Sequence, residues 1–209
     1  MSDTTPERPQ LYLVTPAAFD PDVFAPRLAR VLDGIEVACL RLAMAGQDED
    51  AISRAADALR ELAHSRDIAI VIERHAVLAE RLGLDGVHLP QGARDLRKLR
   101  KTLGEDAIIG TACGTSRHDG LTAAEAGADY VAFGPMGETG LGTGGVADIE
   151  LFSWWSEVIE VPVVAEGALT QALVETLTPI TDFFAIGDEI WGQDDPLAAL
   201  KTLVAPAGY

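Results

Sequence analysis

One group of polar residues in this chain has the side-chain types that acid/base chemistry requires. Glu73, Arg74 and His75 follow an apolar segment, and His88 lies within the next one. A carboxylate and an imidazole held together could exchange protons or ligate a transition metal. However, no pair of ligands has helical i, i+4 spacing, and a histidine in an apolar strand is more often a hydrogen-bonded structural residue. We therefore keep Glu73, His75 and His88 as catalytic candidates and expect no metal site.

Arg41 is a further catalytic candidate, because it lies near the end of an otherwise apolar segment. A charge in that position requires an anionic partner. The partner could be a bound substrate or a carboxylate of the chain, such as Glu73 or Glu166. In contrast, Cys39 and Cys113 have no obvious neighbouring base, so we expect both thiols to be unreactive.

The segment 134–145 contains six glycines in twelve residues. The backbone N–H groups of such a loop can surround an anion, and two hydroxyls could add donors. The residues that would bind the anion are Thr139, Gly142, Thr143 and Gly144. A surface turn explains the same glycines equally well. The segment lacks Gly-Lys-Ser and Gly-Lys-Thr, so it is not a standard P-loop.

Two further glycines, Gly167 and Gly187, each follow an apolar segment and would allow a phosphate to approach the backbone amides closely. Glu166, Asp188 and Glu189 flank them. A carboxylate within about 5 Å of a phosphate in a partly buried pocket opposes binding by a few kcal/mol. Either these acidic side chains point away, or the bound group is not an anion.

Eight apolar segments alternate with eight amphipathic ones, and together they must position these residues. The expected strands are 11–15, 35–42, 68–72, 86–89, 107–111, 130–134, 161–165 and 183–187. The expected helices are 21–32, 50–65, 76–82, 93–103, 117–125, 148–158, 170–177 and 196–203. We expect Thr170 to cap the seventh helix and Gly104 to end the fourth.

Strands buried on both faces and joined by helices indicate a parallel sheet. Eight units in 209 residues match a single α/β domain, a (β/α)8 TIM barrel near its lower length limit. A doubly wound open sheet is the alternative, but no glycine fingerprint follows the first strand. We expect a disordered tail over 1–8, the barrel over 9–204 and a C-terminal tail over 205–209. In a barrel, the candidate residues would meet at the carboxyl ends of the strands.

Composition narrows the classes of partner. The formal net charge of −17 opposes binding to nucleic acid or to an anionic membrane surface. No apolar run is long enough to cross a membrane, and the polar N-terminus resembles no signal peptide, so we expect a soluble cytoplasmic protein. Four aromatic residues could form a homodimer patch or could equally pack the outer helices: Phe152, Trp154, Trp155 and Trp191.

Five segments, in order, resemble the thiamine-phosphate synthase and thiazole tautomerase superfamily over nearly the whole chain. They are LYLVT at 11–15, DGVHL at 85–89 followed by Gln91, IIG at 108–110, GADYVAFGP at 127–135 and VPVVA at 161–165 with Gly167. The resemblance implies a barrel transferase that couples a pyrimidine diphosphate with a thiazole phosphate and releases pyrophosphate. In that family Mg²⁺ shields the diphosphate, and the pyrimidine becomes carbocation-like.

The resemblance also implies roles for individual residues. Arg41 would face the pyrimidine, Gln91 would belong to the loop after the fourth strand, Gly167 would bind the thiazole phosphate, and the loop 140–145 would bind pyrophosphate. The full set of expected substrate-binding residues is Arg41, Arg74, Gln91, Thr139, Gly142, Thr143, Gly144, Glu166, Gly167, Gly187 and Asp188.

This chain departs from the family pattern at several of these positions. The Mg²⁺ ligand positions hold Arg74 and Ala93, and a glutamine and a lysine are replaced by Cys39 and Ala43. Pro135 stands where the tautomerase branch has a histidine. We therefore expect no bound Mg²⁺ and weak or absent synthase activity, although Arg74 could neutralise a phosphate in part. The alternatives are a non-catalytic ligand-binding or regulatory barrel, or a divergent enzyme acting on another heterocycle.

Overall fold

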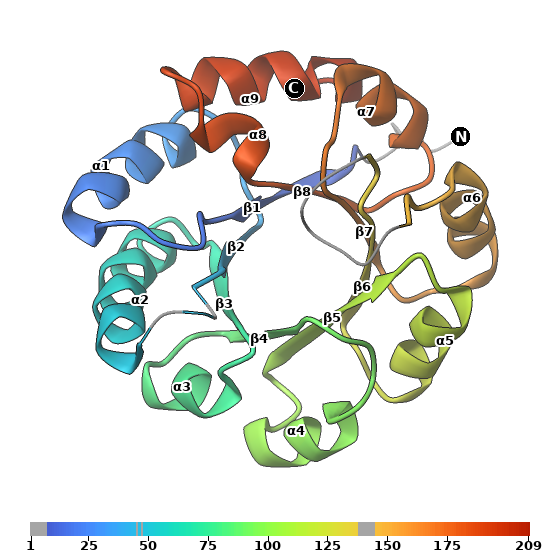
Figure 1. Cartoon of the computed structure of the whole chain (residues 1–209), viewed down its shortest axis with the longest axis horizontal. Helices are drawn as coiled ribbons and strands as arrows, with labels where there is room; N and C mark the ends of the chain where they lie inside the picture. The colour runs from blue at the N-terminus through green and yellow to red at the C-terminus, as the bar shows by residue number, and fades with distance from the viewer. Residues whose placement is uncertain (1–7, 45, 47, 138–144) are drawn as a thin grey trace, which may run out of the picture.

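The computed structural model of the protein describes residues 8–44, 46, 48–137 and 145–209. Eight parallel strands form a closed barrel in chain order, and helices surround it (Figure 1). The strand β8 returns to pair with β1, with Leu13 beside Ile186. This pairing confirms the predicted (β/α)8 barrel and rules out the open sheet.

Most strands and helices lie within about three residues of their predicted bounds, but β2 begins four residues later than the expected strand 35–42. The strands are β1 (Gln10–Val14), β2 (Cys39–Leu42), β3 (Ala69–Glu73), β4 (Gly86–Leu89), β5 (Ile108–Gly114), β6 (Tyr130–Phe133), β7 (Val163–Glu166) and β8 (Phe183–Ile186). The helices are α1 (Pro21–Leu32), α2 (Glu49–His64), α3 (Ala76–Arg81), α4 (Leu96–Leu103), α5 (Arg117–Glu125), α6 (Ile149–Val158), α7 (Gln171–Leu177), α8 (Asp188–Trp191) and α9 (Pro196–Val204). The short helix α8 is an addition that the sequence pattern did not predict.

Side-chain caps begin several of the helices at the rim where the strands end. Thr170 accepts a hydrogen bond from the N–H of Leu173 (3.3 Å) at the start of α7, as expected. Gly104 ends α4 with a φ of 88°, which confirms the second capping prediction. Aspartates cap α1, α2, α6 and α9, namely Asp20, Asp48, Asp148 and Asp195. Part of the negative charge around this rim therefore stabilises helix starts.

Three aspartates tie the strands together at the opposite rim. Asp85, Asp129 and Asp182 each directly precede an even-numbered strand. Their carboxylates accept backbone N–H groups of the preceding odd-numbered strand, from Ile70 (2.7 Å), Ile109 (2.6 Å) and Val163 (2.7 Å) respectively. A repeated carboxylate–amide bond thus fixes three strand pairs without contributing to the mouth.

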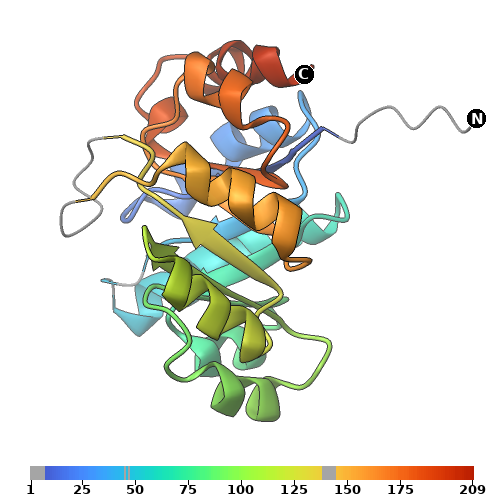
Figure 2. The same ribbon diagram turned by 90° about the vertical axis from the view of Figure 1, so that its right-hand side faces the viewer.

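The apolar core has two parts, one inside the barrel and one between the barrel and its helices. Tyr12, Val71, Tyr130 and Val164 pack inside. The larger cluster fills the space under the helix layer, which Figure 2 shows lying outside the sheet. In the residues that the structure describes, no helix is long and apolar enough to span a membrane.

The aromatic residues considered as a homodimer patch mostly pack the outer helices. Phe152 and Trp155 are fully buried and Trp191 is 5% exposed, so these three rings belong to the core. Trp154 is partly buried, with the Arg117 guanidinium 4.2 Å from its ring centroid. Packing of the outer helices, rather than an exposed homodimer patch, is therefore the correct interpretation for Phe152, Trp155 and Trp191.

The ends of the described chain are held against each other. The segment expected to be a C-terminal tail includes a 3-10 helix, Ala205–Ala207, and the Tyr209 hydroxyl donates to the Pro9 carbonyl (3.0 Å). Arg8, placed in the expected N-terminal tail, donates to the Gly208 carbonyl (3.0 Å) and to Glu36 (3.0 Å).

Candidate active site

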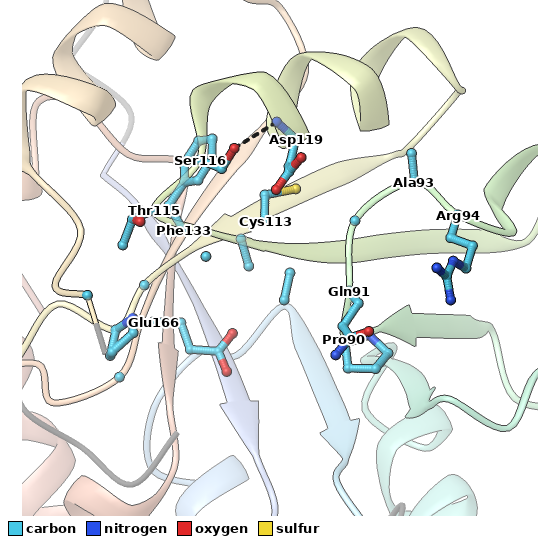
Figure 3. A pocket seen from close by; sticks show the side chains of 18 residues that line it. Pro90, Gln91, Ala93, Arg94, Cys113, Thr115, Ser116, Asp119, Phe133 and Glu166 are labelled. Atoms are coloured by element: carbon cyan, nitrogen blue, oxygen red, sulfur yellow. Dashed lines mark hydrogen bonds between the residues drawn. The ribbon is translucent and has the colours of Figure 1, made fainter. Parts of the chain in front are cut away.

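Two adjoining cavities open at the carboxyl ends of the strands. The larger has a volume of about 880 Å³ and is lined mainly from β1, β2, β3, β7 and β8. The smaller, about 700 Å³, is lined mainly from the segments after β4, β5 and β6 (Figure 3). The residues common to both linings are Pro90, Ala112, Glu166 and Gly167. These four residues form a shared wall, and in Figure 3 the Glu166 carboxylate points into the smaller cavity.

Arg41 and Glu166 form an ion pair at this wall. The Arg41 side chain is 5% exposed and that of Glu166 is 23% exposed. Nη1 of Arg41 donates to Oε2 of Glu166 (3.1 Å), and Nη2 donates to Oε1. Burial alone would lower the pKa of Arg41, but the Glu166 carboxylate outweighs it and holds this pKa above its ordinary value. The sequence left open whether the anionic partner of Arg41 is a bound substrate or a carboxylate of the chain. In the structure the partner is a carboxylate of the chain.

His88 continues the hydrogen-bonded chain into the barrel. Burial, together with the neighbouring Arg41, lowers the pKa of His88 well below its ordinary value. The imidazole is therefore neutral, and Nε2 accepts from Nη1 of Arg41 (2.8 Å). Its hydrogen must then be on Nδ1, which donates to the Tyr130 hydroxyl (2.9 Å). Both ring nitrogens are occupied, so His88 holds Arg41 in place, as the structural interpretation predicted.

Tyr130 and Tyr12 complete this network, and the sequence analysis missed both. Their hydroxyls share a hydrogen bond of 2.6 Å, and burial raises the pKa of each phenol. Tyr130 fills the space above Gly110 on the neighbouring strand, where an added Cβ would lie 1.8 Å from the ring. The sequence signal for an inward-facing tyrosine is a glycine at the paired position of the neighbouring strand. This signal can be recognised only when the strand register is known.

The backbone amides after β7 and β8 are bound by Glu189, on α8. Its Oε2 accepts from the N–H of Gly187 (2.8 Å), and its Oε1 accepts from the N–H of Leu169 (3.2 Å). Gly187 was predicted to bring its amide close to a phosphate. Here that amide donates to a carboxylate of the chain, while Asp188 is exposed and lines the larger cavity.

The other predicted residues divide between the two cavities. Glu73 and Arg74 line the larger cavity, with Nε of Arg74 3.5 Å from Oε1 of Glu73. Gln91 lines the smaller one, and Gly167 contributes to both. Glu73 and His88 are register partners on β3 and β4 and both line the larger cavity, whereas His75, at the N-cap of α3, is in neither lining. Four predicted glycine-loop residues lie outside the described part of the chain: Thr139, Gly142, Thr143 and Gly144.

The two cysteines are unsuited to nucleophilic chemistry. Cys39 and Cys113 are both buried. Burial raises the pKa of each thiol to about 12, so both are protonated at neutral pH. This agrees with the expectation from the sequence.

The residues at the expected Mg²⁺ positions do not fit the ion. Arg74 carries a positive charge and Ala93 has no donor atom, whereas Mg²⁺ prefers carboxylate and water oxygens. Of the four carboxylates in the larger cavity, Glu166 is bound by Arg41 and Glu189 by backbone amides. Among the residues that the structure describes, no group of three or more His, Cys, Asp or Glu side chains could hold a metal ion.

Comparison with known proteins supports one family. A family model described as thiamine monophosphate synthase matches residues 11–185. The thiamine-phosphate synthase of Rhodospirillum centenum is 43% identical over 194 residues, which cover 91% of this chain and 94% of that protein. The thiamine-phosphate synthase of Erythrobacter litoralis is 38% identical over 202 residues, covering 90% and 91%.

Solved structures show the same barrel. Thiamine phosphate pyrophosphorylase from Pyrococcus furiosus has a TM-score of 0.79 at 24% identity, with 95% of each chain covered. A 3-hexulose-6-phosphate synthase has a TM-score of 0.68 at 15% identity, so the fold alone does not single out a reaction. The match along the sequence does single out a family: this chain belongs to the thiamine monophosphate synthase family.

Proposed function

We propose that the protein is a transferase of the type found in its family, joining a pyrimidine and a thiazole at the mouth of the barrel. The observation that supports this most is the pair of adjoining cavities, about 880 and 700 Å³, which meet at Glu166 and Gly167. Ligand cavities commonly measure roughly 300–1,000 Å³, so each has room for one heterocycle. A coupling reaction needs two substrates side by side with their reacting atoms close together.

The Arg41–Glu166 pair provides the electrostatic part of the proposal. In the family reaction, loss of pyrophosphate leaves a pyrimidine with cationic character. The Glu166 carboxylate, at the shared wall, would stabilise that developing charge. Arg41 holds the carboxylate through both of its oxygens, and His88 in turn holds Arg41. The carboxylate is therefore preorganised and need not reorient during the reaction.

The diphosphate group fits the smaller cavity better than the larger one. Four carboxylates and two guanidiniums line the larger cavity: Glu73, Glu166, Asp188, Glu189, Arg41 and Arg74. The smaller cavity has two carboxylates, Asp119 and the shared Glu166, and one guanidinium, Arg94, so its excess of negative charge is smaller. Thr115 and Gly145 also line it. A guanidinium, a hydroxyl and a glycine amide are suitable groups for a phosphate. Since Arg74 and Ala93 do not fit Mg²⁺, no step proposed here depends on the ion.

Product formation from the two substrates tests this function. The purified chain is incubated with the pyrimidine diphosphate and the thiazole, as phosphate or as alcohol, and both the coupled product and pyrophosphate are measured. We expect coupled turnover, reduced in Glu166→Gln by about 10²-fold because a preorganised charge is lost. Glu157→Gln, on the exposed surface of α6, makes the same change in charge away from the site and should keep full activity.

Two outcomes would contradict the proposal. Absence of product at high enzyme concentration, with binding of either heterocycle retained, would indicate a ligand-binding barrel. Unchanged turnover in Glu166→Gln would remove the carboxylate from the mechanism.

A further inference from the structure

Carboxylates of the chain already bind two of the groups in the larger cavity that could otherwise hold a phosphate. Arg41 is bound by Glu166, and the amides of Gly187 and Leu169 are bound by Glu189. In barrels of this kind, the loops after the seventh and eighth strands often form the phosphate site from backbone amides. Glu189 thus takes the hydrogen bonds that a phosphate would need there.

The geometry of Glu189 resembles that of a bound anion. Its two oxygens accept from amides on two different segments, one after β7 and one after β8, at 3.2 and 2.8 Å. The side chain is only partly buried and lines the larger cavity. A phosphate could reach these amides only by displacing the carboxylate or by lying directly against it, and two like charges in contact repel strongly in a partly buried site.

A neutral hydroxyl meets no such obstacle. Each oxygen of an ionised carboxylate has two lone pairs, and each oxygen of Glu189 accepts one amide hydrogen. A ligand alcohol can therefore donate to Glu189, and the exposed carboxylate of Asp188 lies in the same lining. The larger cavity is thus suited to a ligand whose polar arm ends in a hydroxyl.

We propose that Glu189 is a specificity-determining residue that selects an unphosphorylated acceptor, a thiazole carrying a free hydroxyalkyl arm. This inference depends on the proposed coupling function. In the coupling step, the thiazole nitrogen forms a bond to the methylene carbon of the pyrimidine. The bond from that carbon to the diphosphate oxygen breaks, and its electron pair leaves with pyrophosphate. The hydroxyl arm is unchanged, so the product is a thiazolium alcohol.

The test compares the two acceptors, thiazole alcohol and thiazole phosphate, each with the pyrimidine diphosphate. In the wild-type chain, kcat/KM should favour the alcohol by at least about tenfold, because the phosphate must overcome the charge of Glu189. Glu189→Ala exposes the two amides and removes the charge, so the ratio should shift towards the phosphate by about a hundredfold. Glu189→Gln removes only the charge and should give a smaller shift in the same direction.

Glu175→Gln is the matched control, because Glu175 is exposed on α7 and lies outside both cavity linings. This variant should keep the wild-type ratio. Titration calorimetry with each acceptor alone provides a second readout, in which the wild-type chain should bind the alcohol more tightly. The wild-type preference needs no variant, so the inference can be tested even if Glu189→Ala folds poorly.

The outcomes separate the two proposals. Turnover with the phosphate equal to or better than with the alcohol would overturn the role of Glu189 and leave the coupling function intact. An unchanged ratio in Glu189→Ala would do the same. No product and no binding with either acceptor in the wild-type chain would overturn both.

Discussion

The two cavities share a wall but differ in how their charges are arranged. In the larger cavity, Glu166 and Glu189 are bound to partners within the chain, Arg41 and two backbone amides. In the smaller cavity, Arg94 and Gln91 come from the exposed segment between β4 and α4. The larger cavity has four carboxylates and two guanidiniums, whereas the smaller one has two carboxylates, Asp119 and the shared Glu166, and one guanidinium, Arg94.

The difference is one of degree, since both linings hold more carboxylates than guanidiniums, by two in the larger cavity and by one in the smaller. The net charge of −17 alone suggests a mouth that repels every anion. The structure assigns part of that charge to specific tasks, since aspartates cap helices at one rim and bind strand amides at the other. Charge at the site must therefore be counted separately for each cavity.

The largest expected effect is on the free energy of unfolding, and it distinguishes Arg41 in the larger cavity from Arg94 in the smaller one. Arg41→Ala should lower the free energy of unfolding by about 3–5 kcal/mol, because Glu166 loses its partner in a largely buried ion pair. Arg94→Ala, on the exposed side of the smaller cavity, should change this free energy by less than about 0.5 kcal/mol. Urea denaturation of both variants measures the difference. Equal effects would mean that the larger cavity is not held together by this pair.

A double variant refines this prediction. Replacing both Arg41 and Glu166 by methionine removes the charges together, so it should destabilise the chain less than Arg41→Ala does. A double variant as unstable as the single one would show that packing, rather than the unpaired charge, causes the loss.

The next largest effect is a pH dependence of the free energy of unfolding, caused by His88 in the larger cavity. The pKa of His88 is lowered in the folded chain, so below about pH 6.5 the unfolded chain binds an extra proton. The contribution of neutral His88 to the free energy of unfolding is complete above that pH. Below it, this contribution decreases by about 1.4 kcal/mol per pH unit. Denaturation at pH 7.5 and 5.5 should show this loss in the wild-type chain.

Matched histidine variants assign the pH dependence. His88→Asn should show a smaller loss between the two pH values, whereas His118→Asn, on the exposed surface of α5, should show the wild-type loss. An unchanged slope in His88→Asn would mean that another group causes it.

The smallest effect concerns the smaller cavity. Arg94→Ala should weaken the binding of inorganic pyrophosphate about fivefold, since an exposed ion pair contributes up to about 1 kcal/mol. Arg74→Ala, in the larger cavity, should leave this affinity unchanged. Titration calorimetry at low ionic strength measures both affinities. A greater loss in Arg74→Ala would place the diphosphate in the other cavity.

The barrel could be predicted from the sequence because its signals are local. Apolar runs mark the strands, and residues such as Thr170 and Gly104 mark helix ends. The helix α8 was missed because its four residues are too few to show helical periodicity. This omission hid the role of Glu189, whose bonds to two amides depend on the turn that begins at Gly187.

The site was predictable only in part, because its contacts join distant segments. Arg41 stood out as a charge in an apolar strand, and Glu166 was among its suggested partners. Tyr12 and Tyr130 did not stand out, since strands buried on both faces are apolar on both sides. Sequence alone does not indicate which side of such a strand faces the barrel interior.

The distance along the chain between Arg41 and Glu166 has a consequence for folding. These partners are separated by 125 positions, and Tyr12 and Tyr130 by 118. Contacts between such distant positions form slowly, because the intervening chain must first be ordered. Assembly of the reactive centre should therefore coincide with the final cooperative step. An N-terminal fragment that stops before β7 would keep the guanidinium but lack its carboxylate.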